Sequence, residues 1–258
     1  MEIARNADLQ ERLRRIAVLI PCWQPDQRLI ELVESLARFS FQAIVVVNDG
    51  SEAEYDAIFE RVRAIPSAVV LRHERNRGTG RAVKTAMQYA LNSLPKAAGV
   101  VTADADGQHA VSDIVHVAEA IAADGPAPVL GSRRFGPGVP LRSRFGNILT
   151  KYVFLALSGH RFADTQCGLR GIPLRWVPAM LAVKGDRYEF VMSSLAEMCR
   201  LGIPPRQMPI ETIYFRRNRS SHFKPVRDSI RIYFNLFRHY AGMRIKRAPR
   251  GGAGCMSA

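Results

Sequence analysis

Two aspartates, Asp104 and Asp106, stand one residue apart directly after the apolar run at 99–103. Carboxylate oxygens are ligands that Mg²⁺ and Mn²⁺ favour, and such ions are often held by one or two carboxylates together with substrate phosphates. Gln108 offers a third oxygen, and His109 offers a nitrogen. A solvated turn with an aspartate capping the next helix would use the same residues. Because two carboxylates that leave a buried strand add nothing to packing, the placement favours a metal–phosphate site.

Polar residues also follow the other apolar runs in the first half of the chain. Pro21 follows the first run, and Arg133 follows the run at 129–132. The segment Asn48-Asp49-Gly50-Ser51 forms either a turn with a helix cap or a ligand contact. The segment at 76–80, Asn-Arg-Gly-Thr-Gly, resembles a glycine-rich phosphate loop. It matches neither GxxxxGK[ST] nor GxGxxG, which disfavours a P-loop NTPase and a dinucleotide enzyme.

A scaffold that brings these segments together is predicted by the alternation of short apolar runs with stretches of helical periodicity. Nearly continuous apolar runs are typical of parallel strands buried on both faces. The alternation predicts an α/β fold, with an open, mostly parallel, Rossmann-like sheet flanked by helices. In such sheets ligands bind at the carboxyl ends of the strands, where all the segments above lie. The predicted strands are 16–20, 43–47, 68–71, 99–103 and 129–132, and the predicted helices are 26–39, 53–64, 79–94 and 111–123.

The alternation weakens beyond residue 142. We expect helices at 145–157 and 188–201 and a strand at 208–214, followed by a basic stretch that contains aromatic residues. The glycine-rich end at 251–258 is predicted to be disordered. The expected organisation is one catalytic domain over 1–215 and a basic C-terminal extension over 216–258.

The 258 residues carry a formal net charge of +14, and the excess is concentrated late in the chain. Residues 211–250 hold 11 Lys and Arg against two acidic residues, which accounts for nine of the fourteen charges. A basic segment indicates an anionic partner: nucleic acid, a phosphate-rich ligand or an acidic membrane face. The four cysteines form no CxxC pair, which disfavours a structural zinc site. With no signal peptide and no apolar run of membrane-spanning length, we expect a cytoplasmic protein, peripheral at the cytoplasmic face of the membrane.

Taken in order, the motifs resemble those of a family 2 glycosyltransferase of the GT-A fold. Within that family the chain is most similar to the dolichol-phosphate mannosyltransferase-like, polyprenyl-phosphate glycosyltransferase group, over about residues 16–239. Each motif is weak alone, but the ordered set is specific. The motifs are Asn76-Arg-Gly-Thr-Gly80, Asp104-Ala-Asp-Gly-Gln-His109, Asp164-Thr-Gln-Cys-Gly-Leu-Arg170 and Ser220-Ser-His-Phe-Lys-Pro-Val-Arg-Asp-Ser229.

The resemblance implies an inverting transfer from a UDP- or GDP-sugar to a polyprenyl-phosphate-type lipid, with Mg²⁺ or Mn²⁺ as the cofactor. The residues it assigns to the nucleotide sugar are Pro21, Asp49, Arg77, Gly78 and Asp104. The residues it assigns to the metal are Asp104, Asp106 and Gln108. The residues it assigns to the acceptor phosphate are Arg133, Arg144 and Arg170. It also makes Asp106 and Asp164 catalytic, with Asp164 acting as a base or orienting the acceptor.

The chain departs from the family pattern at two places. Gln24-Pro25 stands where an Asn-Glu pair is common, and Asn48-Asp49 stands where the family has two aspartates. Both changes touch the implied nucleoside pocket and leave open whether the donor carries UDP or GDP.

A phosphate acceptor is largely ionised at pH 7, so the site needs cations more than it needs a base. Such a lipid acceptor suggests that the basic aromatic segment 216–247 and the apolar residues of 148–155 rest on anionic headgroups. The alternative is that both are ordinary helices packed on the sheet. Two other functions stay open: a family 2 transferase with another lipid or soluble acceptor, and a basic nucleic-acid- or membrane-binding protein without catalysis. We expect no nucleic-acid partner, because nucleic-acid binding leaves the carboxylates after the strands unexplained.

Overall fold

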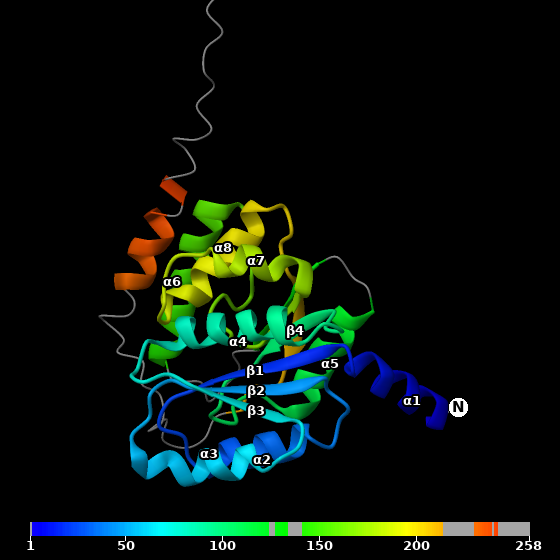
Figure 1. Ribbon diagram of the computed structural model, residues 1–258. Helices are drawn as coiled ribbons and strands as arrows, with labels where there is room; N and C mark the ends of the chain where they lie inside the picture. Colours follow the sequence, from blue (N-terminus) through cyan, green and yellow to red (C-terminus); the bar gives the residue numbers. More distant parts are fainter. Residues whose placement is uncertain (1, 124–126, 134–140, 214–229, 239, 242–258) are drawn as a thin grey trace, which may run out of the picture.

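The computed structural model describes residues 2–123, 127–133, 141–213, 230–238, 240 and 241. Within these residues one seven-stranded sheet runs in the order β3-β2-β1-β4-β6-β5-β7, with helices on both of its faces (Figure 1). The predicted α/β fold with an open, mostly parallel sheet is confirmed. The strands are β1 (Ile16–Cys22), β2 (Ala43–Asn48), β3 (Ala68–Arg72), β4 (Gly99–Thr102), β5 (Val129–Arg133), β6 (Arg170–Pro173) and β7 (Arg206–Ile210).

Six of these strands point in the same direction. β2, β1 and β4 pair in parallel, as do β2 with β3 and β5 with β7. The short β6 runs antiparallel to both of its neighbours, β4 and β5, so β5 has the direction of β4. The carboxyl ends of β1 to β5 therefore meet at one edge of the sheet.

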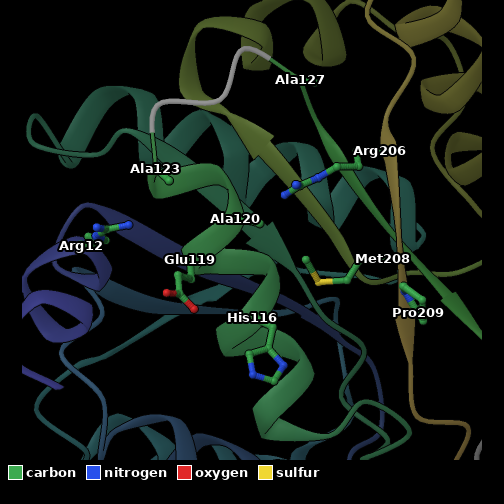
Figure 2. Close-up of a pocket in the computed structure, with 9 residues that line it drawn as sticks. All are labelled: Arg12, His116, Glu119, Ala120, Ala123, Ala127, Arg206, Met208 and Pro209. Carbon is green, nitrogen blue, oxygen red and sulfur yellow. The ribbon is translucent and has the colours of Figure 1, made fainter. Parts of the chain in front are cut away.

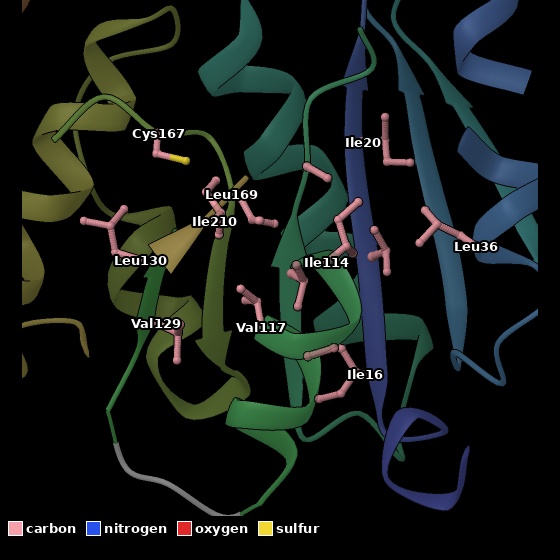
Figure 3. Close-up of a cluster of buried hydrophobic side chains, with 14 of the residues drawn as sticks. Ile16, Ile20, Leu36, Ile114, Val117, Val129, Leu130, Cys167, Leu169 and Ile210 are labelled. Atoms are coloured by element: carbon pink, nitrogen blue, oxygen red, sulfur yellow. The ribbon is translucent and has the colours of Figure 1, made fainter. Parts of the chain in front are cut away.

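Alternate residues of the central strand feed two hydrophobic clusters. Ile16, Val18 and Ile20 belong to one cluster, while Ala17 and Leu19 belong to the other, as the twofold period of a strand requires. All five side chains are fully buried. Figure 3 shows part of the first cluster, where β1 and α5 contribute side chains to one contiguous core.

Helices cover both faces of the sheet. Figure 1 shows α2 and α3 on one side of β1 to β3 and α4 on the other. α8 contributes to both clusters and thus joins the two halves of the core. The helices are α1 (Glu2–Leu13), α2 (Gln27–Leu36), α3 (Asp56–Arg63), α4 (Thr79–Ser93), α5 (Val111–Ala122), α6 (Leu141–Ser158), α7 (Val177–Leu181) and α8 (Glu189–Arg200), with 3-10 turns at Ala53–Tyr55 and Leu174–Trp176.

Several elements differ from the expectations. β7 begins two residues earlier than predicted and ends at Ile210, because it pairs with the whole of β5 from Val129 opposite Arg206. The predicted end of that strand, Tyr214, lies outside the described residues. α1, β6 and α7 were not predicted at all. α1 ends at the fully buried Leu13, immediately before β1.

The late part of the chain is described over one further helix, at 230–238. Its residues Ile232 and Leu236 are buried in the first cluster, so this helix packs on the main body of the fold. The predicted domain boundary at 215–216 and the predicted disordered end at 251–258 lie outside the described residues. Over the described parts of the chain, no helix combines the length and apolarity that crossing a membrane requires.

Candidate active site at the carboxyl ends of the strands

Asp104 lies between the end of β4 and the loop that precedes β6. The Thr102 hydroxyl donates to the Gly168 carbonyl over 2.6 Å and ties the loop to the strand. A Cβ at Gly168 would lie 2.5 Å from Asp104 Oδ2, so only glycine lets the loop backbone approach this carboxylate. His109 Nε2 donates to the same oxygen over 3.0 Å. This contact assigns His109 to orienting Asp104, a role that the sequence left open.

Charges around Asp104 determine its ionisation. Partial burial disfavours the carboxylate, but the hydrogen bond and charge of His109, followed by the charges of Arg133 and Arg170, hold the pKa of Asp104 below its usual value. The same finding shows that Arg133 and Arg170 lie within electrostatic reach of Asp104. The fold therefore gathers residues from the ends of β4 and β5 and the start of β6, which are far apart in the sequence, into one charged cluster.

The pKa of Asp106 is shifted in the opposite direction to that of Asp104. Burial and the negative charge of Asp104 raise its pKa, against the opposing effects of the Gln108 backbone N–H, His109 and Arg28. The Gln108 N–H donates to Asp106 Oδ1 over 3.0 Å. A second carboxylate held near Asp104 at this cost is typical of a site completed by a cation.

The donor set suits Mg²⁺ or Mn²⁺. Within the described part of the chain, Asp104 Oδ1 and Asp106 Oδ2 accept no hydrogen bond, which leaves one carboxylate oxygen of each residue available. No group of three or more His, Cys, Asp and Glu side chains among the described residues could hold a metal by itself. Two carboxylate oxygens complemented by substrate phosphates are the usual arrangement for Mg²⁺.

Asp49, after β2, is fully engaged within the protein. Its side chain is buried, and Oδ1 accepts from His73 Nδ1 over 2.6 Å and from the Arg77 N–H over 3.0 Å. Oδ2 accepts from the Gly78 N–H over 2.7 Å. Two amides of the glycine-rich segment at 76–80 thus point to Asp49. They are satisfied there and do not face a phosphate.

The other side of the 76–80 segment is covered by residues 185–187. Gly78 has φ +104°, and a Cβ there would lie 2.4 Å from the Asp186 carbonyl oxygen. Asp186 also accepts from Arg81 over 2.7 Å and from the buried Lys84 over 3.2 Å. Sequence patterns gave no signal for His73, Lys84 or Asp186, because each acts on a segment that is remote in the chain.

Gln24, one of the two departures from the expected pattern, lies in the turn after β1. Its φ of +51° is in the left-handed region, which a residue other than glycine rarely adopts. Its backbone N–H donates to the Ser51 hydroxyl over 2.8 Å, and Asn48 Oδ1 accepts from the Ser51 N–H over 2.8 Å. Both departures therefore belong to one hydrogen-bonded connection between the ends of β1 and β2.

Arg133 and Asp164 form an ion pair at the end of β5. Arg133 Nε donates to Asp164 Oδ2 over 2.6 Å, and Asp164 has no exposed surface. Arg170 is buried and donates to the Cys167 and Thr165 carbonyls, and burial lowers its pKa to about 10. Of the three arginines predicted to bind the acceptor, two lie in this cluster. The third, Arg144, belongs to the part of α6 whose side chains are outside the described residues.

Pro21, Asp104 and Arg170 line one narrow cavity of about 30 Å³, together with residues of α4 and α8. A wider groove of about 700 Å³ lies elsewhere, between α5 and β7 (Figure 2). Its lining includes Ala127 and Arg206, which stand at the amino-terminal ends of β5 and β7. The carboxylates with available oxygens and the clustered arginines lie at the carboxyl edge and not in this groove, which makes the carboxyl edge the candidate site.

The sequence of the chain matches the model of one protein family. The sequence model of the family described as Glycosyl transferase family 2 matches residues 17–170, which span β1 from its second residue to the end of β5 and include Asp104, Asp106 and Asp164. The chain belongs to glycosyl transferase family 2. This glycosyltransferase has a GT-A fold, and it is an enzyme by the family it belongs to.

Two relatives match most of this glycosyltransferase. An uncharacterized protein of Methanocaldococcus jannaschii is 30% identical over 222 residues, which cover 83% of this chain and 89% of the relative. The UDP-N-acetylglucosamine–dolichyl-phosphate N-acetylglucosaminyltransferase of Methanococcus voltae is 28% identical over 217 residues, which cover 77% of this chain and 86% of that enzyme.

Solved structures share the fold of this glycosyltransferase. The glucosyl-3-phosphoglycerate synthase of Mycobacterium tuberculosis, in complex with Mn²⁺, UDP and glucosyl-3-phosphoglycerate, superposes with a TM-score of 0.68 at 17% identity. The match covers 97% of this chain and 87% of that chain. At this level of identity the likeness establishes the architecture alone.

Proposed function

We propose that this glycosyltransferase moves a sugar from a UDP- or GDP-sugar to a polyprenyl-phosphate-type lipid, with inversion at the anomeric carbon and with Mg²⁺ or Mn²⁺. The observation that carries the proposal is the Asp104–Asp106 pair, which keeps one unpaired oxygen on each carboxylate beside the charges of Arg133 and Arg170. The lipid acceptor is supported by the Methanococcus voltae relative, whose name specifies dolichyl phosphate. The metal and UDP are supported by the Mycobacterium tuberculosis complex.

In this proposal Asp104, Asp106 and the Gln108 side chain hold the metal, which supplies positive charge for the leaving diphosphate. His109 fixes the Asp104 carboxylate through its 3.0 Å hydrogen bond. An oxygen of the ionised acceptor phosphate attacks the anomeric carbon as the bond to the nucleoside diphosphate breaks. This direct displacement inverts the anomeric centre and requires no proton to be removed from the acceptor.

Some of the residues assigned to the donor contact it directly in this proposal, and others only shape the segment around it. Pro21 lines the same narrow cavity as Asp104, so we assign it to the nucleoside side of the donor. The Arg77 guanidinium is a candidate contact for the donor phosphates. Asp49 and Gly78 contribute through the shape of the 76–80 segment, because the Asp49 carboxylate is occupied by His73, Arg77 and Gly78.

An exposed apolar surface next to this cluster supports a lipid acceptor and peripheral contact with the cytoplasmic membrane face. We call it the α6–230 surface. The helix at 230–238 lies beside α6 (Figure 1), and the Thr150 and Tyr233 hydroxyls are hydrogen-bonded over 3.0 Å. Gln166, in the loop that also carries Asp164, donates to Thr150 over 3.1 Å. The large exposed side chains of the surface are Ile148, Leu149, Tyr152, Ile230, Phe234 and Phe237.

Cations accompany the apolar side chains of the α6–230 surface. Arg231 and Arg238 belong to the helix at 230–238, and Lys151 lies between Leu149 and Tyr152 in sequence. Exposed aromatic and aliphatic residues mixed with cations are typical of helices that rest on anionic headgroups. Since the surface connects through Thr150 and Gln166 to the Asp164 loop, a lipid headgroup bound there would lie near the reaction site.

The reaction is tested by incubating the purified protein with radiolabelled UDP- and GDP-sugars and a short-chain polyprenyl phosphate, with and without EDTA. Label that enters the organic phase only when Mg²⁺ or Mn²⁺ is present is the expected result, and it identifies the sugar and the nucleotide. Metal-dependent donor binding without lipid label would mean that the enzyme uses another lipid or a soluble acceptor instead of a polyprenyl phosphate. Salt-sensitive oligonucleotide binding without either signal would favour the non-catalytic alternative.

Flotation with vesicles tests the membrane contact. Binding to vesicles rich in an anionic lipid is expected to fall at least about tenfold in Tyr152→Ser/Phe234→Ser, because two large exposed side chains no longer enter the interface. Transfer to a short, water-soluble acceptor is expected to persist in this variant. Arg231→Gln/Arg238→Gln is the companion variant, and its binding is expected to decline on anionic vesicles only. Flotation that is unaffected by both variants would remove the α6–230 surface from the proposal.

A further inference from the structure

The loop at 164–170 is tied to the end of β4 at the point where it passes Asp104. The Thr102 hydroxyl donates to the Gly168 carbonyl over 2.6 Å, and a Cβ at Gly168 would lie 2.5 Å from Asp104 Oδ2. These contacts fix the part of the loop that lies next to the carboxylates assigned to the metal. They do not reach the first residues of the loop, where Asp164 lies.

The first residues of the loop are connected to α6 and to the helix at 230–238. Gln166 makes two hydrogen bonds: its N–H donates to Asp164 Oδ1 over 3.0 Å, and its Nε2 donates to the Thr150 hydroxyl over 3.1 Å. The Thr150 and Tyr233 hydroxyls are hydrogen-bonded over 3.0 Å. We call these three contacts the Tyr233–Gln166 network. Through it, a helix late in the sequence reaches the loop that carries Asp164.

The centre of the Tyr233–Gln166 network is shielded from water. Thr150 is 1% exposed, so a partner that its hydroxyl loses is not replaced by solvent. Tyr233 is half-buried, and its neighbours Ile232 and Leu236 are buried in the first hydrophobic cluster. The packing of these two residues holds the Tyr233 side chain in place. The network therefore joins the loop to a part of the fold that is itself firmly packed.

We propose that Tyr233 is a positioning residue for the transfer reaction: through the Tyr233–Gln166 network it holds the start of the 164–170 loop in the place that transfer requires. The inference rests on the proposed function, because it gives the helix that carries Tyr233 a part in that reaction besides its contact with the membrane. Tyr233 lies beyond the residues that the family model matches, so membership of the family does not assign it this role.

The test removes the Tyr233 hydroxyl alone and measures transfer to a short, water-soluble acceptor without vesicles, so that membrane contact contributes nothing. Tyr233→Phe is expected to lower kcat/KM for the acceptor about fivefold, the effect of losing one hydrogen bond. The donor KM is expected to stay within about twofold of the wild-type value, because Thr102 holds the Gly168 end of the loop independently. Flotation with anionic vesicles is expected to be unchanged, since the aromatic ring remains.

Tyr152→Phe is the matched control on the same surface. Tyr152 is 65% exposed, and its hydroxyl has no hydrogen bond with the described part of the chain. Its replacement is expected to leave kcat/KM unchanged. An equal effect of Tyr233→Phe and Tyr152→Phe would overturn the proposal, because the loss would not come from the network.

A double-mutant cycle tests whether Tyr233 acts through Thr150. Thr150→Val removes the central hydroxyl and both of its hydrogen bonds in the network, and kcat/KM is expected to fall about 20-fold. In that background Tyr233→Phe is expected to add less than about 1.5-fold. Thr150→Ser keeps the hydroxyl and is expected to retain at least about half of the wild-type value, which separates the hydroxyl from the packing of the side chain. Fully multiplicative losses in the cycle would refute the network.

Hydrogen exchange in the protein without substrates distinguishes a failure of this inference from a failure of the proposed function. The Gln166 backbone N–H is expected to be protected in the wild type and to exchange at least about threefold faster in Tyr233→Phe, but not in Tyr152→Phe. The same response without any transfer to polyprenyl phosphate would refute the lipid acceptor and support the network. Exchange that is identical in the three proteins would refute the network, whichever acceptor the enzyme uses.

Discussion

Two halves of the carboxyl edge of the sheet, after β2 and after β4, hold the same residue type in different hydrogen-bonded states. After β2, Asp49 accepts three hydrogen bonds from His73, Arg77 and Gly78 and is buried. After β4, Asp104 and Asp106 each leave one oxygen without a hydrogen bond among the described residues. The position after a parallel strand is the same in both halves. The difference teaches that the unmet hydrogen-bonding capacity of a carboxylate, and not its place after a strand, distinguishes a candidate ligand from a structural anchor.

The largest expected effect tests the β4 half of this comparison. Asp106→Asn is expected to lower transfer about 1000-fold or more, because it removes a charge from the proposed site of the leaving diphosphate. The stability of the fold is expected to hold or rise. The pKa of Asp106 is raised in the folded protein, so at neutral pH its ionised form opposes folding, and neutral asparagine removes that opposition.

The measurements for Asp106→Asn are transfer rate and urea unfolding at pH 7, with Asp56→Asn as the control at an exposed ion pair. Wild-type activity in Asp106→Asn would mean that the charge at this position does not act on the diphosphate. A large loss of stability would place Asp106 among the anchors, together with Asp49.

The opposite pattern is expected for Asp49→Asn in the β2 half. The amide nitrogen of asparagine replaces an acceptor, so at least one of the His73, Arg77 and Gly78 donors loses its buried partner. A loss of about 3 kcal/mol in the free energy of unfolding is expected, of the order of removing a charged hydrogen-bond partner from a buried site. Urea unfolding checks it. If Asp49→Asn left stability intact but abolished donor binding, Asp49 would be a ligand after all, and the comparison would fail.

Sequence patterns predicted the scaffold well because the scaffold is built from local signals. The five apolar runs became β1 to β5, and the direction of those strands followed from the helices between them. β6 escaped prediction because Arg170–Pro173 holds a glycine and a proline in four residues and has no strand pattern. It is a strand only because the 164–170 loop places it between β4 and β5, with which it pairs. Tertiary pairing, and not local strand propensity, therefore determines this element.

Sequence patterns predicted which residues lie at the site, but they did not predict the burial and the hydrogen bonds of those side chains. Nothing in the sequence shows that the Asp49 carboxylate accepts a hydrogen bond from His73, because His73 lies 24 residues away, directly after β3. In the same way, the burial of Asp164 depends on Arg133 and on the loop around it. A motif can therefore indicate which residues gather at a sheet edge, whereas the hydrogen bonds that decide their roles come from the assembled fold.

An effect of similar size is expected where the 76–80 segment meets residues 185–187. Gly78→Ala is expected to lower the free energy of unfolding by about 2 to 4 kcal/mol, from a disfavoured positive φ and from a Cβ placed 2.4 Å from the Asp186 carbonyl oxygen. Gly159→Ala is the matched control, since its φ is +74° and a Cβ there meets nothing within 4 Å. The control measures the cost of the positive φ alone, which is about 1 kcal/mol of unfolding free energy. Equal losses in the two variants would show that the close approach does not constrain the segment.

The smallest effect separates two cations that share one partner. Lys84 and Arg81 both pair with Asp186, but the Lys84 side chain is 9% exposed and that of Arg81 is 37% exposed. Lys84→Met is expected to cost about 1 to 2 kcal/mol of unfolding free energy, because the Gly185 carbonyl also loses its donor. Arg81→Met is expected to cost about 0.5 kcal/mol, as exposed ion pairs do. Thermal unfolding of both variants measures the difference. Should the two losses be equal, the backbone contacts at Gly78 and Gly80 alone would hold the segment, and the β2 half of the edge would be anchored by Asp49 without help from Lys84.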